Sequence, residues 1–378
     1  MKKIIFRNLA ADCVKFFLLT IFTISTIIWV LQAVNYLDFV IEDGHGFFVY
    51  FNFTLLSFPK ILSRIYPFAI FLSFSYILLK YEDKNELIIF WNFGIKKISL
   101  INFLIKVSFF FVIFSLLLNA LIVPTAQDKA RSFIRSSNLD FFESALKPKT
   151  FVDIVKNLTI YYEKKNENGE LENMFLYDKS SINESQTTIA KTGIFEMRGD
   201  KRILVLHDGK TINNVNGKTS EFNFSKTDFN ISNFTTQTVT QQKTQETSTK
   251  DLILCSFILN NLKKDIDNKI LPELNNCYLN NIENIYKEIY SRLIKPIYII
   301  FLVAISLLLI LKSKSDPTFK SQKFKIYSLG FLSIIFIETS SKFISPNLIE
   351  NLFLSVLPFV SILMIYFYFL ITLKVKKT

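Results

Sequence analysis

Long blocks of apolar residues, each bounded by lysines, constrain the fold of this 378-residue chain more than any other feature. The first block runs from Val14 to about Leu37, and further blocks fill much of residues 47–79, 98–123 and 296–373. A helix of about 20 apolar residues crosses the hydrocarbon core of a bilayer. The blocks therefore predict a polytopic α-helical membrane protein with about six transmembrane helices, three before and three after a polar middle region.

The placement of positive charge predicts how these helices are oriented. A formal net charge of +12 would also suit a nucleic-acid-binding protein. The basic residues, however, gather beside the apolar blocks, at residues 2–7, 80–97, 312–325 and 374–377. Because lysine and arginine mark the cytoplasmic ends of membrane helices, we expect a membrane protein with both termini in the cytoplasm and no nucleic-acid partner.

The N-terminal block could be a secretory signal peptide, but it exceeds the roughly 7–15 apolar residues of a signal core, and no small-x-small cleavage site follows it. We interpret it as a retained transmembrane helix. The acidic residues Asp38, Glu42 and Asp43 then mark the outer side, where Gly44–Gly46 forms a turn.

Prolines divide the next two blocks in our interpretation. Residues 47–79 are too long for one straight span. We expect their first part, with Pro59, to lie along the outer membrane interface before the chain enters the membrane at Pro67, where the proline either kinks the helix or starts the spanning part. The third span, Ile98–Val123, is expected to end at Pro124.

A short amphipathic segment, residues 82–94, lies between the second and third blocks. Asp83 or Asn85 can cap a helix there, and Glu86 falls in its first turn, where a carboxylate suits the positive helix end. Gly94 offers a left-handed stop. A helix this short does not fold alone, so we expect it to rest on the cytoplasmic face of the membrane and to meet a partner.

The character of the sequence changes after residues 1–124, which hold the first three spans. Residues 125–148 predict a polar helical stalk. Residues 149–234 alternate apolar and polar positions between turn dipeptides such as Asp208-Gly209 and Asn216-Gly217. This pattern predicts an inserted antiparallel β-domain, a sandwich or open barrel, on the side of the membrane away from the cytoplasm.

The C-terminal part returns the chain to the membrane. Residues 235–289 predict a linker and a helical return segment that is broken at Pro272, and residues 290–378 contain the last three spans. Cys255 and Cys277 of the return segment could form a disulfide or remain unpaired, and unpaired buried cysteines are common.

Recognisable catalytic and metal-binding motifs are missing from the sequence. His45 and His207 each fall in or beside a turn without a partner at metal-ligand spacing. The sequence contains no P-loop, GxSxG or HExxH motif. We therefore expect neither an enzyme activity nor a cofactor of the chain's own.

Three polar residues of the predicted spans remain. Glu338 is placed well inside the block 326–344, and a charge at that depth is costly. It could be neutral or paired within the bundle, or it could line a substrate cavity or a helix interface. Lys60 and Arg64 could bind an anionic headgroup or could extend to water.

Several stretches, in this order and topology, resemble the LptF/LptG (YjgP/YjgQ) permeases of lipopolysaccharide export. They are PFAIFL at 67–72, NELIIFWNFGI at 85–95, LIVP at 121–124 and EIYSRLIKP at 288–296. The resemblance covers nearly the whole chain. Between the two paralogues, WVLQAVNYLD at 29–38 and KPKTF at 147–151 are more similar to the LptF side.

The resemblance implies a permease subunit of an ABC transporter that extracts lipopolysaccharide from the inner membrane. Such a subunit would pair with an LptG-like paralogue on an LptB-like ATPase dimer, which binds the ATP. Its β-jellyroll-like domain would pass the lipid to LptC- and LptA-like periplasmic jellyroll proteins. The residues implied in contact with the ATPase are Asn85, Glu86, Leu87, Phe90, Trp91 and Gly94, with Glu86 meeting a basic residue.

The sequence departs from the family in one respect. The family has basic residues near the outer end of the first helix that help to hold lipid phosphates, whereas this chain is acidic there. Lys60, Arg64 and Arg292 are the nearest candidates for headgroup contacts. Two other functions stay open: a permease of another ABC system with a different cargo, and a non-transport membrane scaffold whose β-domain binds partners.

Overall fold

The computed structural model describes residues 2–37, 47–155, 158–166, 169–181, 184–198, 201–215, 218–230, 243–262 and 277–375. The chain divides into two compact units. The helical unit comprises Met1–Gln32, Leu56–Lys129 and Gln242–Thr378, and the second unit comprises Ala33–Leu55 and Ala130–Gln241. The predicted turn and acidic residues between 38 and 46, and the predicted break at Pro272, lie outside the described residues.

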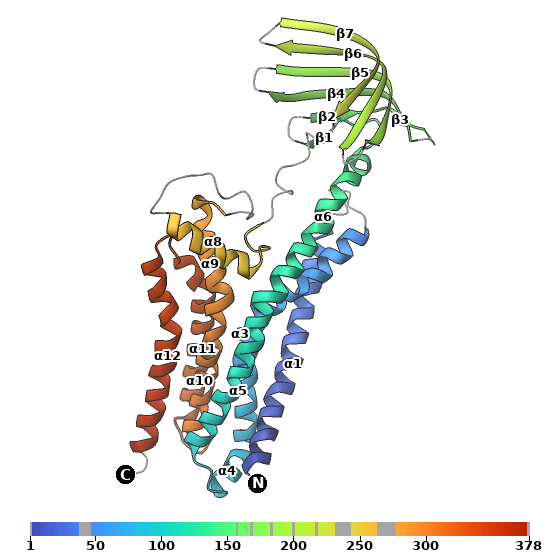
Figure 1. Ribbon diagram of the computed structural model, residues 1–378. Helices are drawn as coiled ribbons and strands as arrows, with labels where there is room; N and C mark the ends of the chain where they lie inside the picture. Colours follow the sequence, from blue (N-terminus) through green and yellow to red (C-terminus); the bar gives the residue numbers. More distant parts are fainter. Residues whose placement is uncertain are drawn as a thin grey trace. The chain divides into compact units, whose positions relative to one another are not determined.

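Long helices make up most of the helical unit (Figure 1). They are α1 (Lys2–Asn35), α3 (Phe47–Asp83), α5 (Lys97–Leu117), α10 (Tyr298–Leu307), α11 (Phe319–Ser340) and α12 (Leu348–Val375). Helix α6 (Val123–Ala145) begins in this unit, but most of it belongs to the second unit, as do the end of α1 and the start of α3. Five helical stretches among the described residues are long and apolar enough to cross a membrane: 3–35, 47–83, 97–134, 279–311 and 349–374. This confirms the polytopic helical fold.

Helix α11 corresponds to the sixth predicted span, but its composition is less apolar than that of the other five. It carries Lys320, Lys323 and Lys325 in its first half and Glu338 in its last turn. It nevertheless packs tightly against α3. A Cβ atom added at Gly330 would lie 2.0 Å from the ring of Phe71, so a glycine is needed where the two helices approach.

Residues 47–83 form a single helix, α3, with Pro59 and Pro67 inside it. The chain therefore does not unwind at Pro67, and the placement of the part before Pro67 along the outer membrane interface stays a prediction. Unpaired backbone groups are costly in hydrocarbon, where no water replaces a lost hydrogen bond. In a continuous helix, each proline leaves unpaired only the carbonyl group that its missing N–H would have reached. Unwinding a whole turn would leave more backbone groups unpaired.

The helix of the third predicted span does not end at Pro124. Helix α5 passes through a π turn, Leu118–Ile122, directly into α6. Pro124 has no N–H group to donate to the carbonyl four residues earlier, at Ala120. The hydroxyl of Thr249 donates a hydrogen bond to that carbonyl instead. The π turn and this side chain together let the helix continue past the proline.

The two ends of the helical unit differ. Helix α1 begins, α12 ends and the short helix α4 (Glu86–Asn92) lies at one end of the bundle (Figure 1). Helices α8 (Thr249–Leu262) and α9 (Ile282–Ile289) lie at the other end (Figure 1). Between the two ends, a continuous apolar core contains the fully buried side chains of Tyr66, Phe71, Phe74, Tyr298 and Phe369.

The second unit contains the predicted antiparallel β-domain. Its strands are β1 (Val152–Val155), β2 (Leu158–Tyr161), β3 (Lys164–Lys165), β4 (Leu171–Ser181), β5 (Glu184–Arg198), β6 (Lys201–Val215) and β7 (Lys218–Asn230). They form one seven-stranded sheet in the order β1-β2-β4-β5-β6-β7, with β3 beside β4. Every described pair is antiparallel, and Figure 1 shows the sheet as strongly curved.

Period-two alternation explains the core of this unit. Leu158, Ile160, Met174 and Leu176 of β2 and β4, together with Leu204 and Leu206 of β6, form one buried cluster. Phe195, Phe224 and Phe229 pack against it. Side chains that alternate along each strand in this way place one face of the sheet in a core and leave the other face exposed.

The dipeptide Asp208-Gly209 does not form the hairpin turn that we predicted. Strand β6 runs straight through it, with Gly209 paired to Ala190 on one side and Phe224 on the other. A Cβ atom at Gly209 would lie 2.2 Å from the carbonyl oxygen of Ile189 and 2.6 Å from the Phe224 ring. The glycine therefore serves a close approach between strands rather than a turn. The other predicted turn, residues 216–217, lies outside the described residues.

Candidate functional site

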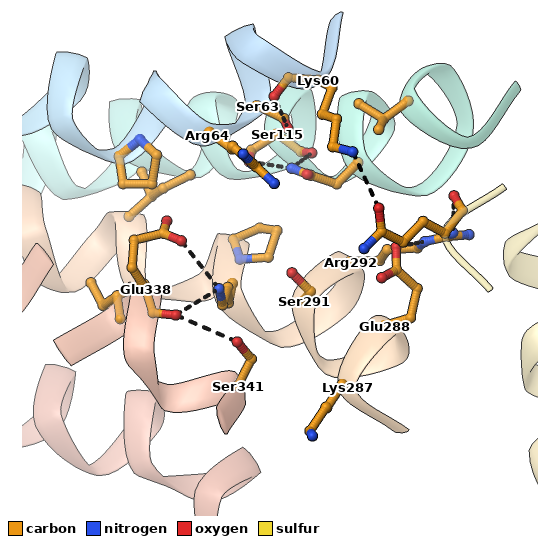
Figure 2. Close-up of a pocket in the computed structure, with 18 of the residues that line it drawn as sticks. Lys60, Ser63, Arg64, Ser115, Lys287, Glu288, Ser291, Arg292, Glu338 and Ser341 are labelled. Carbon is orange, nitrogen blue, oxygen red and sulfur yellow. Dashed lines mark hydrogen bonds and ion pairs between the residues drawn. The ribbon is translucent and has the colours of Figure 1, made fainter. Parts of the chain in front are cut away.

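A pocket of about 460 Å³ lies within the helical unit, among α3, the α5–α6 run and the α9–α11 segment (Figure 2). Five basic side chains line it: Lys60, Arg64, Lys287, Arg292 and Lys295. Only two carboxylates line it, those of Glu288 and Glu338, so positive charge exceeds negative charge by three. The remaining polar lining includes serines, Asn119, Gln127 and Gln245.

The pocket brings together Lys60, Arg64 and Arg292, which the sequence analysis named as candidates for headgroup contacts, and Glu338, which it singled out separately. Lys60 and Arg64 come from α3, Arg292 from the π turn Tyr290–Ile294 after α9, and Glu338 from α11 (Figure 2). Their spacing in the sequence gave no sign that they share a site. Sequence reasoning missed Lys287, Glu288 and Lys295. The available signal was the amphipathic α9 pattern, in which Glu283 and Lys287 stand four residues apart and pair on one face.

Arg292 is held by the protein itself. Its side chain is 3% exposed, and its Nε donates to Glu288 Oε1 over 3.0 Å. Its Nη1 donates to the Thr247 carbonyl and to Thr249 Oγ1, both over 2.9 Å, and its Nη2 donates to the Gln245 carbonyl over 3.0 Å. Most of its donors are therefore committed. Arg292 fastens the segment before α8 to the start of the next membrane-spanning stretch.

Arg64 has the opposite environment. Its side chain is exposed in the pocket, and no other described residue forms a hydrogen bond or an ion pair with it. One turn earlier on α3, Lys60 Nζ donates to Gln127 Oε1 over 3.1 Å and to Gln245 Oε1 over 3.2 Å. A guanidinium group with free donors can bind a phosphate or a carboxylate through two parallel hydrogen bonds. Arg64 is thus the cation of this pocket that is best placed for an anionic ligand.

Glu338 lies in the last turn of α11, which ends at Ser340. The sequence had placed it well inside a helix that continued to residue 344. Its carboxylate faces Lys295 Nζ over 3.4 Å, and Lys295 Nζ also donates to the Glu338 carbonyl over 3.3 Å. The Glu338 side chain is 48% exposed, whereas that of Lys295 is 15% exposed. Glu338 is therefore paired with Lys295 and also lines the pocket.

A disulfide joins Cys255 of α8 to Cys277, which precedes α9. The bond answers the question that the sequence left open. Around it, Leu252, Leu259, Ile282 and Ile285 complete a small apolar core of its own. The disulfide and the hydrogen bonds of Arg292 together fix the wall of the pocket that contains Gln245, Lys287 and Glu288. Within the described ranges, no group of three or more His, Cys, Asp or Glu side chains is placed to hold a metal ion.

The predicted amphipathic helix forms at the opposite end of the bundle but is shorter than residues 82–94. Helix α4 begins at Glu86, because Asn85 adopts a left-handed backbone with a φ of 61° and makes no capping hydrogen bond through its side chain. Glu82 and Asp83 belong to the end of α3. Glu86 falls in the first turn as predicted, and Gly94 follows the helix with a φ of 69°, the left-handed stop that the sequence predicted.

The two faces of α4 differ in a way that suits a docking helix. Leu87 and Phe90 are buried against the bundle, whereas Ile88, Ile89 and Phe93 are exposed. The nearby Lys97 ammonium group lies 5.5 Å from the centre of the Trp91 ring. The carboxylate of Glu86 forms no hydrogen bond or ion pair with any other residue that the structure describes. The helix therefore presents an apolar patch beside a carboxylate without a partner.

These features define the class of protein: a polytopic membrane protein with a basic pocket within its helices and an antiparallel sheet inserted in the middle of its chain. A family model described as lipopolysaccharide export system permease LptF/LptG matches residues 7–372. The chain therefore belongs to the LptF/LptG family. It is a transporter component of the permease type and is not itself a hydrolase.

A relative in Rickettsia prowazekii (strain Madrid E), described as an uncharacterized protein, shares part of this sequence. The two chains are 22% identical over 225 residues, which is 59% of this chain and 62% of the relative. The similarity thus spans less than two thirds of either protein.

Proposed function

We propose that this chain is the LptF-like permease subunit of an ABC transporter that extracts lipopolysaccharide from the bacterial inner membrane. The observation that carries the proposal is the basic pocket among membrane-spanning helices, with Arg64 exposed in it and unengaged by the described residues. Lipopolysaccharide combines acyl chains with anionic phosphates. Apolar helices suit the acyl chains, and an excess of cations in a cleft with low-dielectric walls attracts the phosphates.

The cations of the pocket have different tasks in this proposal. Arg64 and Lys60 bind phosphate groups of the lipid directly. Lys295 is neutralised by Glu338. Arg292 shapes the site by holding residues 245–249 in place. Among the three candidate headgroup contacts of the sequence, Arg292 thus becomes a supporting residue.

The curved sheet receives the lipid after extraction in this proposal. Its buried face is lined by leucines and phenylalanines, a surface suited to acyl chains. Strand β7 pairs with β6 along one side only within the described sheet. A strand with an unpaired side can extend a sheet into that of a neighbouring protein. LptC- and LptA-like jellyroll proteins on the periplasmic side are the partners that we propose for this edge.

The energy for extraction comes from a partner ATPase dimer in this scheme, with an LptG-like paralogue as the second permease subunit. Helix α4 supports this part of the proposal, because its exposed Ile88, Ile89 and Phe93 form an apolar patch next to Glu86. A basic residue of the ATPase would pair with Glu86. This places α4 and both chain termini on the cytoplasmic side.

Photo-crosslinking of the complete transporter tests the proposed cargo. A photoreactive amino acid at Phe224, which packs against the buried cluster of the sheet, should crosslink to lipopolysaccharide in proteoliposomes only when ATP is hydrolysed. The matched control is Ile189, whose side chain is exposed and belongs to the other face of β5 from the buried Ala190. A crosslink at neither position under ATP turnover would contradict lipopolysaccharide export. Co-purification with an ATPase but a crosslink to another lipid would favour a different cargo.

A further inference from the structure

Glu82 is a buried carboxylate that neither the pocket nor the sheet uses. It lies in the last turn of α3, and the residue is 6% exposed. Its Oε1 accepts hydrogen bonds from Ser313 Oγ over 2.8 Å and from the backbone N–H of Lys314 over 2.7 Å. Burying a carboxylate is costly unless donors replace its water shell. Here the donors come from a loop that lies 231 residues further along the chain.

Further hydrogen bonds join the same two regions. Lys314 Nζ donates to the carbonyl of Asp83 over 2.9 Å. On the other side of α4, Lys97 Nζ donates to the carbonyls of Ile310 over 2.9 Å and Leu311 over 3.2 Å. Residues before and after α4 are therefore both attached to residues 310–314, which connect α10 to α11.

This attachment is relevant to how a movement of α4 spreads. Helix α4 has only seven residues and is too short to be stable alone. By chain connectivity it is joined only to α3 and α5, which belong to the first part of the chain. The pocket, however, also has walls from α9 to α11, in the last part of the chain. A push on α4 that reached only α3 and α5 would move one side of the pocket and leave the other side in place.

We propose that Glu82 is a positioning residue that makes the α4 corner and the α10–α11 loop move as one body. The inference rests on the proposed function, in which an ATPase acts on α4. Glu86 is the residue that meets the ATPase, whereas Glu82 acts inside the permease and contacts no partner. Its two short hydrogen bonds distribute the movement of α4 to both halves of the helical bundle.

Distance measurements in the complete transporter test this role. Spin labels on cysteines introduced at the exposed Asn92 of α4 and Lys323 of α11, in a Cys13→Ser background, report whether the two regions move together. In the unmodified protein we expect one narrow distance distribution that is the same with and without trapped nucleotide. In Glu82→Leu we expect this distribution to broaden when nucleotide is trapped. Lipid released per ATP hydrolysed should fall about tenfold, because two charge-assisted hydrogen bonds are lost.

Two control variants separate positioning from simple stability. Glu82→Gln keeps an oxygen that can accept both hydrogen bonds, so it should restore most of the coupling. Asp83→Asn changes an exposed side chain whose backbone carbonyl, and not its carboxylate, accepts from Lys314, so it should behave like the unmodified protein. ATP hydrolysis and the melting temperature should change little in all three variants.

The proposal is overturned if Glu82→Leu retains the narrow distribution and the normal yield of lipid per ATP. If Glu82→Leu does not assemble, Ser313→Ala, which removes one donor to the same oxygen, decides the question by the same two readouts. The distances do not depend on the cargo. If the transporter hydrolyses ATP without releasing lipopolysaccharide, the proposed function is refuted. The distance measurements would still test the role of Glu82.

Discussion

Replacing Arg292 by methionine tests whether this residue holds the structure together, in contrast to Arg64, which is exposed in the same pocket. The substitution keeps an unbranched side chain but removes the charge and all five N–H donors. It leaves the carboxylate of Glu288 and the carbonyls of Gln245 and Thr247 without the donors that hold them. We expect the segment before α8 to detach from the π turn that carries residue 292.

The size of the effect follows from burial. Removing one partner of a buried and hydrogen-bonded ion pair costs about 3–5 kcal/mol. The Glu288 side chain retains 22% exposure, so water can partly replace the lost guanidinium, and the lower end of that range applies. Since about 1.4 kcal/mol corresponds to a tenfold change, local opening of residues 243–252 should become on the order of a hundredfold more frequent.

Amide hydrogen exchange of the purified protein measures this opening directly. Residues 243–252 should lose protection in Arg292→Met, while the β-sheet should keep it. Arg64→Met is the matched control, because Arg64 is exposed and unengaged by the described residues. It should leave exchange unchanged, within about 0.5 kcal/mol, but weaken binding of a phosphate-bearing lipid. Unchanged protection in Arg292→Met, or a loss of protection in Arg64→Met, would refute this division of roles.

Three further substitutions test other parts of the structure. Glu86→Ala should leave the protein in the membrane but weaken its association with the ATPase or uncouple ATP hydrolysis from lipid export. Glu86→Arg should have a larger effect, because it would bring two positive charges together. Unchanged lipid export in both variants would exclude the coupling role. Cys255→Ser should destabilise the α8–α9 core by about 3 kcal/mol, since the disulfide closes a loop with a sequence separation of 22 residues. Equal heat inactivation of the unmodified protein with and without reductant would contradict this. Gly209→Ala should lower the free energy of unfolding by roughly 1–3 kcal/mol and lower the melting temperature, because the added Cβ would collide with the Ile189 carbonyl. Ala190→Gly serves as a comparison on the paired strand. An unchanged melting temperature in Gly209→Ala would show that the strands can separate without cost.

The membrane architecture could be predicted from the sequence because it depends on local composition. A continuous block of apolar residues that is long enough to span a bilayer favours a helix, because a helix satisfies its backbone hydrogen bonds within the segment itself. Alternation of apolar and polar residues likewise predicted the inserted sheet. The left-handed stop at Gly94 was predicted correctly for the same reason, as only local backbone geometry is involved.

Local rules failed where a distant residue compensates for a local defect. Pro124 is a helix-ending signal by itself, but Thr249 satisfies the carbonyl that the proline leaves free. Asp208-Gly209 is a turn signal by itself, but the neighbouring strands need a glycine where their backbones approach. Neither compensation can be inferred from residues close in sequence, because the compensating groups are brought there by the fold.

The sequence by itself determined the class of structure, the order of its parts and the cations that are candidates for contact with an anion. Only the tertiary structure decided which of these residues act together. Lys60, Arg64 and Arg292 resemble one another as isolated cations, yet packing leaves Arg64 exposed and surrounds Arg292 with acceptors. The physical reason is that charge is a property of a residue, whereas burial and hydrogen bonding are properties of its neighbours. In this chain many of those neighbours are distant in sequence: residues 43–47 positions earlier hold Arg292, and Glu82 and Ser313 lie 231 residues apart.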